Sequence, residues 1–355
     1  MIKNKHSILG TNQKNTIFTI TDYNRPFLRF FKRGSKIMQI FRSLETVPKN
    51  ENISLAIGTF DGVHLGHAEI IKECRADISC KSAVLTFDVH PRQFLYPEFA
   101  PKTLTFPYEK YAFFKNLGVD YVIELPFSEY RSMEPETFLD ILAQSMQLRQ
   151  ITIGFNFFFG KNQKGNADLA FWWGRSAGVK ICVAEPFLKN GMRVSSSAIR
   201  EFVLSGQMRN AASFLVYPFL ISGTVKRGKQ IGRTLNFPTL NLETPEKIMP
   251  PDGVYITQTV FDGRQFTSLT NIGTNPTIDA ESKQKIIETW VDSDEIGELY
   301  DKKISVYFLK KIRNEIRFSS KEKLAATISN DKEICHNFMQ SEKIKELPDI
   351  FKNND

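Results

Sequence analysis

The first half of the chain alternates two kinds of segment, and this alternation constrains the fold more than any other feature. From about residue 52, short apolar runs such as 52–60, 82–88 and 150–158 are separated by longer amphipathic stretches. Strands that alternate with helices of roughly 10 to 15 residues predict right-handed crossovers and a buried parallel sheet. We therefore expect a Rossmann-like α/β domain whose ligands bind beyond the carboxyl ends of its strands.

The second half has a different pattern. After about residue 216, strand-like runs are broken by Gly, Pro and Asn turns, and a helical period returns only over 319–340. This pattern predicts an antiparallel sheet or small β-barrel closed by a C-terminal helix. The predicted parts are an irregular extension (1–37), an α/β domain (38–215), a barrel domain (216–345) and a tail (346–355). The extension lacks the continuous apolar run of a secretory signal, and we favour Met38 as the true start.

Composition excludes several classes of protein. With 41% hydrophobic and 24% charged residues the chain is an ordinary globular one, and no apolar run approaches the roughly 20 residues that span a bilayer. The four cysteines are scattered, which argues against a zinc cluster or a disulfide framework and favours a reducing cytoplasm. The net charge of +8 arises from basic residues spread among 39 acidic ones. We therefore expect neither a nucleic-acid nor a membrane partner.

Two of the five histidines lie in the segment GTFDGVHLGH, which follows the first strand-like run. Gly58 and Gly62 permit tight turns, and His64 and His67 stand three residues apart where a helix begins. That spacing places both imidazoles on one side, near the free N–H groups and the positive end of the helix, which suits a phosphate. The alternatives are two capping or surface histidines, or a zinc pair that lacks a third ligand and the general base of HExxH.

Three further loops are predicted to reach the same edge of the sheet. TFDVHPRQF carries His90 and Arg92, and GFNFFFGKNQKGN carries Asn156, although its aromatic residues can equally be packing residues. In RVSSSAIR, Ser196 and Ser197 begin a helix, where hydroxyl and N–H groups can hold a phosphate or simply cap the helix. Together the four loops favour a nucleotide site.

A second group of motifs lies in the barrel half. SGTVKRGKQIGRTLNFPTLNL is rich in Gly, Lys and Arg without a Walker A sequence, so it is either a phosphate-binding flap or a basic hairpin loop. Within it, Thr239 and Asn241 alternate onto one face of a strand, where their oxygens can hold Mg²⁺ with phosphate and water. Glu288 is the only acid in its apolar strand. It is either a salt-bridged surface residue or a general base for phosphoryl transfer, and the neighbouring motif favours the base.

These motifs resemble a known family. GTFDGVHLGH, TFDVHPR, GFNFFFG and RVSSSAIR look like the adenylyltransferase module of the bacterial bifunctional riboflavin kinase/FAD synthetases, a member of the HxGH nucleotidyltransferases. GTVKRGKQIGRTLNFPTLNL, PPDGVY, TNIGTNPT and ETW look like the riboflavin kinase module of the same family. The resemblance runs in family order over roughly residues 52 to 335. It implies a cytoplasmic enzyme that phosphorylates riboflavin to FMN with ATP and then adenylylates FMN to FAD and pyrophosphate.

The resemblance also implies roles for individual residues. His64 and His67 would bind and polarise the ATP phosphates, Thr239 and Asn241 would hold Mg²⁺–ATP, and Glu288 would be the base on the ribityl 5′-hydroxyl of riboflavin. The other expected site residues of the first module are Gly58, Phe60, Asp61, Asn156, Arg193, Ser196, Ser197 and Arg200. Those of the kinase module are Gly223, Lys226, Gly228, Gly232, Arg233 and Arg313. The expected partners are small molecules only, for a monomer or weak homo-oligomer.

Several positions depart from the family pattern. Thr59 replaces Asn, Val89 replaces Pro, Asn156 replaces the frequent Asp, Asn236 and Asp301 replace Gly, and Trp290 replaces His. Asn and Asp are the non-glycine types best able to adopt left-handed backbone, so we expect both turns to survive. No residue given a chemical role is missing, and both activities are expected. The alternatives are a riboflavin kinase with an inactive adenylyltransferase module, and a non-catalytic flavin-binding regulator.

Overall fold

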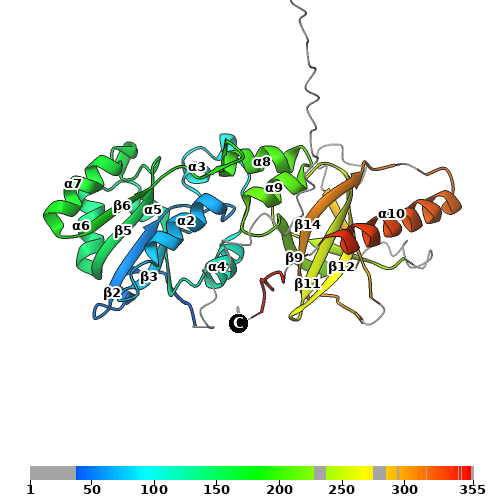
Figure 1. The fold of residues 1–355 in the computed structure, drawn as a ribbon, viewed down its shortest axis with the longest axis horizontal. Coiled ribbons are helices and arrows are strands. Elements are labelled where there is room, and N and C mark those ends of the chain that lie inside the picture. The colour runs from blue at the N-terminus through cyan, green and yellow to red at the C-terminus, as the bar shows by residue number, and fades with distance from the viewer. Residues whose placement is uncertain are drawn as a thin grey trace, which may run out of the picture.

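The computed structural model describes residues 37–227, 237–274, 285–293, 296–316, 318–342, 344 and 346–352. It contains an α/β unit and a β-barrel unit that lie side by side (Figure 1). Nearly all of the predicted N-terminal extension lies outside the described residues. So do Gly228, Gly232, Arg233 and Asn236 of the predicted flap.

The α/β unit is built on a parallel sheet with the strand order β1-β4-β3-β2-β5-β6. Its strands are β1 (Gln39–Phe41), β2 (Asn52–Ile57), β3 (Lys81–Phe87), β4 (Tyr121–Leu125), β5 (Gln147–Gly154) and β6 (Lys180–Ala184). The predicted parallel α/β fold is confirmed. The edge strand β1 was not predicted, because three residues are too few to show a period.

Helices cover both faces of this sheet. The main ones are α2 (Leu65–Cys74), α4 (Pro107–Asn116), α6 (Pro135–Ser145) and α7 (Ala167–Ala177). Helices α2 and α4 share a core with Ala56 and Val84, whereas α6 and α7 share a core with Leu55 and Leu85, which point to the opposite face. The strand order reverses direction between β2 and β5. Ligands of open α/β sheets bind beyond the strand ends at such a switch point.

The second unit is a closed barrel with the strand order β10-β13-β12-β11-β14-β9 and antiparallel pairing throughout. Its strands are β9 (Leu220–Lys226), β10 (Thr239–Glu243), β11 (Gly253–Phe261), β12 (Arg264–Thr274), β13 (Lys285–Val291) and β14 (Lys303–Arg313). The C-terminal helix α10 (Lys321–Ser341) packs Cys335 and Phe338 against Val254 and Leu269 on the outside of the barrel. The predicted barrel with a C-terminal helix is therefore confirmed.

The two units are connected by α8 (Ser196–Leu204) and α9 (Met208–Phe214), and they share one apolar core. A buried ion pair crosses this junction. Lys247 Nζ lies 2.7 Å from Glu109 Oε2, and both side chains are 0% exposed. Lys247 also donates to the carbonyl of Leu220, while Glu109 accepts from the Phe106 N–H and from the Ser222 hydroxyl. The charges are thus compensated by hydrogen bonds, which a buried ion pair needs in order to offset its loss of hydration.

Breaking this pair should destabilise the whole chain. Lys247→Met leaves the Glu109 carboxylate buried without its cation, and we expect the free energy of unfolding in urea to fall by about 3–5 kcal/mol. Adding Glu109→Gln to Lys247→Met should recover much of the loss, because no uncompensated charge remains.

The matched control is Lys102→Met, which removes the cation of the exposed Lys102–Glu246 pair. Exposed pairs contribute about 0–1 kcal/mol, so this variant should unfold like the wild type. Equal effects of Lys102→Met and Lys247→Met would contradict the proposed importance of the buried pair.

Candidate active sites

A cavity of about 960 Å³ opens at the carboxyl ends of the strands of the α/β unit. Its walls come from the segments after β2, β3 and β5 and from the start of α8, as the strand order predicts. The cavity brings together eight of the expected site residues, which are Gly58, Phe60, His64, His67, Asn156, Arg193, Ser196 and Ser197. It also contains His90 and Arg92, the N-cap and the second residue of the short helix α3 (Pro91–Leu95) that follows β3.

The turn between β2 and α2 has an unusual backbone. Phe60, Gly62 and Val63 have φ of 50°, 87° and 40°. Positive φ is costly for a β-branched residue such as Val63, and it persists only where the surrounding structure holds it. Strain of this kind concentrates at functional sites.

Two N–H groups of the turn have no hydrogen-bond acceptor in the described part of the chain. The carbonyls of Phe60, Asp61 and Val63 accept hydrogen bonds from Val63 N–H, the Ser196 hydroxyl and Val216 N–H. In the described part of the chain, no acceptor is bonded to the N–H of Thr59 or Phe60, and both residues line the cavity. Unpaired backbone donors in a turn beside a cavity are typical of anion-binding sites.

His64 and His67 cap the start of α2 reciprocally. His64 Nδ1 accepts from the His67 N–H at 3.1 Å, and His67 Nδ1 accepts from the His64 N–H at 3.4 Å, with the two rings stacked 3.5 Å apart. The two histidines therefore cap the helix, which was one of the alternatives, and they also line the cavity. Since each Nδ1 is an acceptor, each neutral ring carries its proton on Nε2, where it can be donated to a ligand.

Burial keeps both imidazoles neutral. Desolvation lowers the pKa of His64 to about 3, with a small opposing effect of its backbone hydrogen bond. Burial also lowers the pKa of His67 well below its usual value, and the nearby His64 and Lys110 lower it further. Neutral rings hold Nε2–H donors without the desolvation cost of two buried cations.

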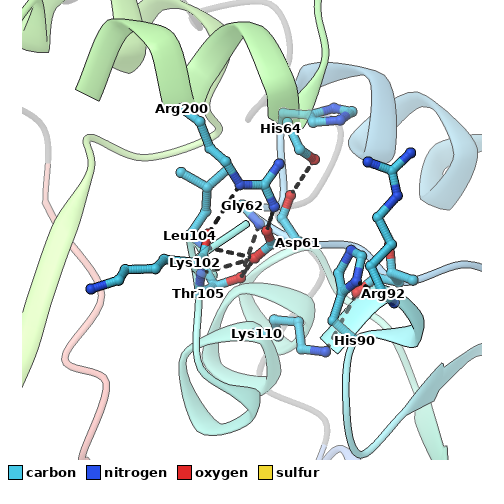
Figure 2. A network of polar contacts seen from close by, with 12 residues as sticks. Asp61, Gly62, His64, His90, Arg92, Lys102, Leu104, Thr105, Lys110 and Arg200 are labelled. Carbon is cyan, nitrogen blue, oxygen red and sulfur yellow. Dashed lines mark hydrogen bonds and ion pairs between the residues drawn. The ribbon is translucent and has the colours of Figure 1, made fainter. Parts of the chain in front are cut away.

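Asp61 and Arg200 lie outside the lining of this cavity, although both were expected to bind ATP or FMN. Asp61 Oδ1 accepts from the N–H groups of Leu104 and Thr105 at 2.9 and 3.0 Å, and Oδ2 pairs with the Arg200 guanidinium (Figure 2). Arg200 Nε also donates to the carbonyl of Lys102. The two charges neutralise each other and tie the turn to α8.

Strand register assembles the expected kinase residues on the outside of the barrel. Asn241 on β10 lies directly opposite Lys226 on β9 and Glu288 on β13, and Glu288 lies opposite Asn271 on β12. Opposed residues share a face of the sheet, so these four side chains form a row across four strands. Thr239, two residues before Asn241, lies on the same face.

The other described kinase residues have structural contacts. A Cβ at Gly223 would lie 2.1 Å from the Glu243 carbonyl, so glycine is required by the approach of β9 and β10. Arg313 forms a two-pronged ion pair with Asp331 of α10 and so fixes that helix to the barrel. Lys226 pairs with Asp301 at 3.0 Å, and Asp301 has φ of 62°, the left-handed conformation expected there.

Several other cavity residues were not predicted as site residues, because the short helices and loops that carry them show no hydrophobic period. They are Leu95, Tyr96, Phe127, Tyr130, Arg131, Phe155 and Phe158. Phe155 and Phe158 are 40% and 56% exposed, and the Arg193 guanidinium lies over the Phe155 ring.

In the described residues, no helix has the length and apolarity to cross a membrane.

Comparison with known proteins gives matches to both halves. A family model described as FAD synthetase matches residues 46–198, and one described as riboflavin kinase matches residues 215–339. The bifunctional riboflavin kinase/FMN adenylyltransferase of Buchnera aphidicola subsp. Schizaphis graminum is 34% identical over 85% of this chain and 99% of its own. The proteins of the same name from Pseudomonas fluorescens and Escherichia coli K12 are 32% and 31% identical, over 83% and 85% of this chain and 96% and 97% of their own.

One solved structure shares the fold of most of the chain. It is a protein from Streptococcus pneumoniae described as a macrolide-efflux protein, with a TM-score of 0.74 at 24% identity, over 85% of this chain and 99% of its own. At this identity the likeness concerns the fold alone.

The neutral histidines predict a pH-dependent stability. Unfolded imidazoles take up protons near pH 6.5, whereas the folded ones do so only at much lower pH, so the unfolded state binds more protons below pH 6.5 and is favoured there. His67→Gln removes one such group. The free energy of unfolding should fall between pH 8 and pH 5 in both proteins. The fall should be about 2 kcal/mol smaller in the variant than in the wild type.

Denaturation in urea at the two pH values measures this difference. Asn156→Ala is the control, because it alters the same cavity without removing a titrating group, and it should keep the wild-type pH dependence. A His67→Gln variant with the wild-type pH dependence would show that His67 is not held neutral.

Proposed function

Because the chain belongs to the bifunctional riboflavin kinase/FMN adenylyltransferase family, we propose that its two reactions are divided between the cavity of the α/β unit and the outer face of the barrel. The enzyme phosphorylates riboflavin with ATP to FMN, and it adenylylates FMN with ATP to FAD and pyrophosphate. The family and the two activities predicted from the motifs are thereby confirmed. Each reaction is assigned to particular residues on the basis of their contacts and positions.

Adenylyl transfer needs positioning and charge stabilisation rather than a protein nucleophile. A phosphate oxygen of FMN bonds to the α-phosphorus of ATP, the bond from that phosphorus to the bridging oxygen breaks, and pyrophosphate leaves. The Nε2–H groups of His64 and His67 and the N–H groups of Thr59 and Phe60 donate to the phosphate oxygens as negative charge builds up there. The single observation that carries this assignment is the reciprocal capping of the two histidines at the cavity wall.

The remaining cavity residues bind the two substrates. Ser196 and Ser197 at the start of α8 and the Arg193 guanidinium hold phosphate, and Asn156 contacts the nucleotide. The exposed rings of Phe155 and Phe158 offer apolar surface for the flavin ring. Asp61 and Arg200 act indirectly, by holding the turn and α8 in place.

Phosphoryl transfer takes place on the barrel. Glu288 takes the proton of the riboflavin 5′-hydroxyl while the hydroxyl oxygen bonds to the γ-phosphorus of ATP and ADP leaves. Mg²⁺ fits the oxygen donors of Thr239 and Asn241, which share a strand face and leave other coordination positions to water and phosphate. Bound Mg²⁺ would offset the negative charge of the phosphates. Lys226, in the same row, adds positive charge.

The domain limits, the location and the assembly state complete the proposal. The domains extend over 38–215 and 216–345, in keeping with the end of α9 at Phe214 and the start of β9 at Leu220. The enzyme works in the cytoplasm, in keeping with its four free cysteines. It acts as a monomer or weak homo-oligomer.

The general-base role of Glu288 can be tested with the second activity as an internal control. Glu288→Gln should lower the rate of FMN formation from riboflavin by about 10²- to 10⁴-fold, because the amide cannot accept the proton. FAD formation from supplied FMN should stay at the wild-type rate. Timed chromatographic separation of riboflavin, FMN and FAD measures both steps.

The matched control for Glu288→Gln is Glu333→Gln, which changes an exposed carboxylate on α10 and should affect neither step. Unchanged FMN formation by Glu288→Gln would exclude the base role. Wild-type protein that never converts supplied FMN to FAD would instead exclude the assignment of the cavity.

The metal role of Thr239 predicts a changed Mg²⁺ requirement. Thr239→Val keeps the side-chain shape but removes the oxygen, so the Mg²⁺ concentration that gives half-maximal kinase activity should rise by about 10-fold or more. Thr239→Ser keeps an oxygen and should stay close to the wild type. A Mg²⁺ titration identical for the two variants would contradict the ligand role.

A further inference from the structure

Lys110 is a buried cation beside the adenylyltransferase cavity. It lies on α4 and is 7% exposed, and in the described part of the chain it forms no ion pair. Its Nζ lies 3.4 Å from the carbonyl oxygen of Thr59 and 3.4 Å from the hydroxyl of Thr86 at the end of β3. Lys110 also lines a smaller cavity of about 220 Å³ that shares Thr59, Phe87 and His90 with the larger one. Figure 2 shows Lys110 together with His90 and Asp61.

Packing alone does not explain a lysine at this position. The two carboxylates whose charges act on Lys110 are engaged elsewhere, since Asp61 pairs with Arg200 and Glu124 pairs with Arg42. Burial lowers the pKa of Lys110, and the more distant charges of Asp61 and Glu124 only partly oppose this effect. A methionine of similar length would fill the space without any desolvation cost.

The contact with Thr59 has a geometric consequence. The carbonyl of Thr59 and the N–H of Phe60 are the two ends of one planar peptide group, and in a trans peptide they point in opposite directions. Lys110 Nζ and the Thr86 hydroxyl, also 3.4 Å away, both donate to the Thr59 oxygen. Fixing that oxygen on one side fixes the direction of the Phe60 N–H on the other.

The Phe60 N–H is one of the two donors of the turn that have no partner in the described structure. Phe60 has φ of 50°, so the surrounding contacts and not the intrinsic preference of phenylalanine maintain its conformation. A peptide whose carbonyl accepts from a cation is also polarised, which strengthens its N–H as a donor.

We propose that Lys110 is a positioning residue for adenylyl transfer, which with Thr86 holds the Thr59–Phe60 peptide so that the Phe60 N–H donates to the phosphate group under attack. The inference rests on the proposed assignment of the cavity to that reaction. Because the N–H is needed most as negative charge develops, the effect of Lys110 falls on the chemical step more than on substrate binding.

The decisive experiment compares steady-state FAD formation by Lys110→Met and Lys110→Arg with that of the wild type. Lys110→Met should lower kcat by about 10- to 100-fold, somewhat less than the direct loss of an oxyanion donor, with KM for FMN and ATP within about twofold of the wild type. Lys110→Arg keeps a donor and should recover much of kcat. Riboflavin phosphorylation by the same preparations should be unchanged, which controls for folding.

Two further variants separate positioning from general disturbance. Lys115→Met changes an exposed lysine of the same helix and should leave both activities unchanged. Thr86→Val should lower kcat in the same direction as Lys110→Met, and the double variant should lose less than the product of the two single effects, because both side chains act on one oxygen.

Other outcomes overturn the proposal. A wild-type kcat in Lys110→Met, a rise in KM at constant kcat, or an equal fall of the kinase rate would each exclude a positioning role. The His67→Ala variant shows whether a negative result concerns the cavity as a whole or only the role of Lys110. If both Lys110→Met and His67→Ala form FAD at the wild-type rate, the assignment of adenylyl transfer to the cavity fails. If only His67→Ala loses activity, that assignment stands and the positioning role of Lys110 is rejected.

Discussion

The carboxylate of Asp61 is the contact on which both the site and the junction of the two units depend. It accepts hydrogen bonds from the backbone of Leu104 and Thr105 just before α4, and it pairs with Arg200 on α8. Helix α4 carries Glu109 to the barrel, and α8 leads through α9 to its first strand. The buried carboxylate of Asp61 thus connects the turn after β2 to α4 and α8, the two helices that lead to the barrel.

The sequence predicted features that depend on local patterns. Alternating runs predicted the parallel sheet, and the GTFDGVHLGH segment predicted a tight turn with both histidines on one side of a helix start. Thr239 and Asn241 were predicted to share one face of a strand, and register places Asn241 opposite Glu288. These predictions succeeded because turns, caps and strand faces are set by residues a few positions apart.

Features that depend on pairing between distant segments were not predictable. Asp61 and Arg200 were expected at the ligand from the family resemblance, but these two residues, 139 positions apart, neutralise each other. Glu109 and Lys110 look like ordinary polar residues of an amphipathic helix, and only the tertiary structure shows that both are buried. The hydroxyls of Thr257, Ser268, Thr270 and Thr289 bond to one another within the barrel, so polar residues there are core residues.

Glu109 and Lys110 are neighbours on α4 that serve different units. Glu109 binds Lys247 and Ser222 of the barrel, and Lys110 contacts the turn of the nucleotide cavity. A shift of the helix that accommodated a new residue at the barrel surface would also move the ammonium at Thr59. A substitution at this part of the barrel surface can therefore alter the nucleotide cavity of the other unit without touching it.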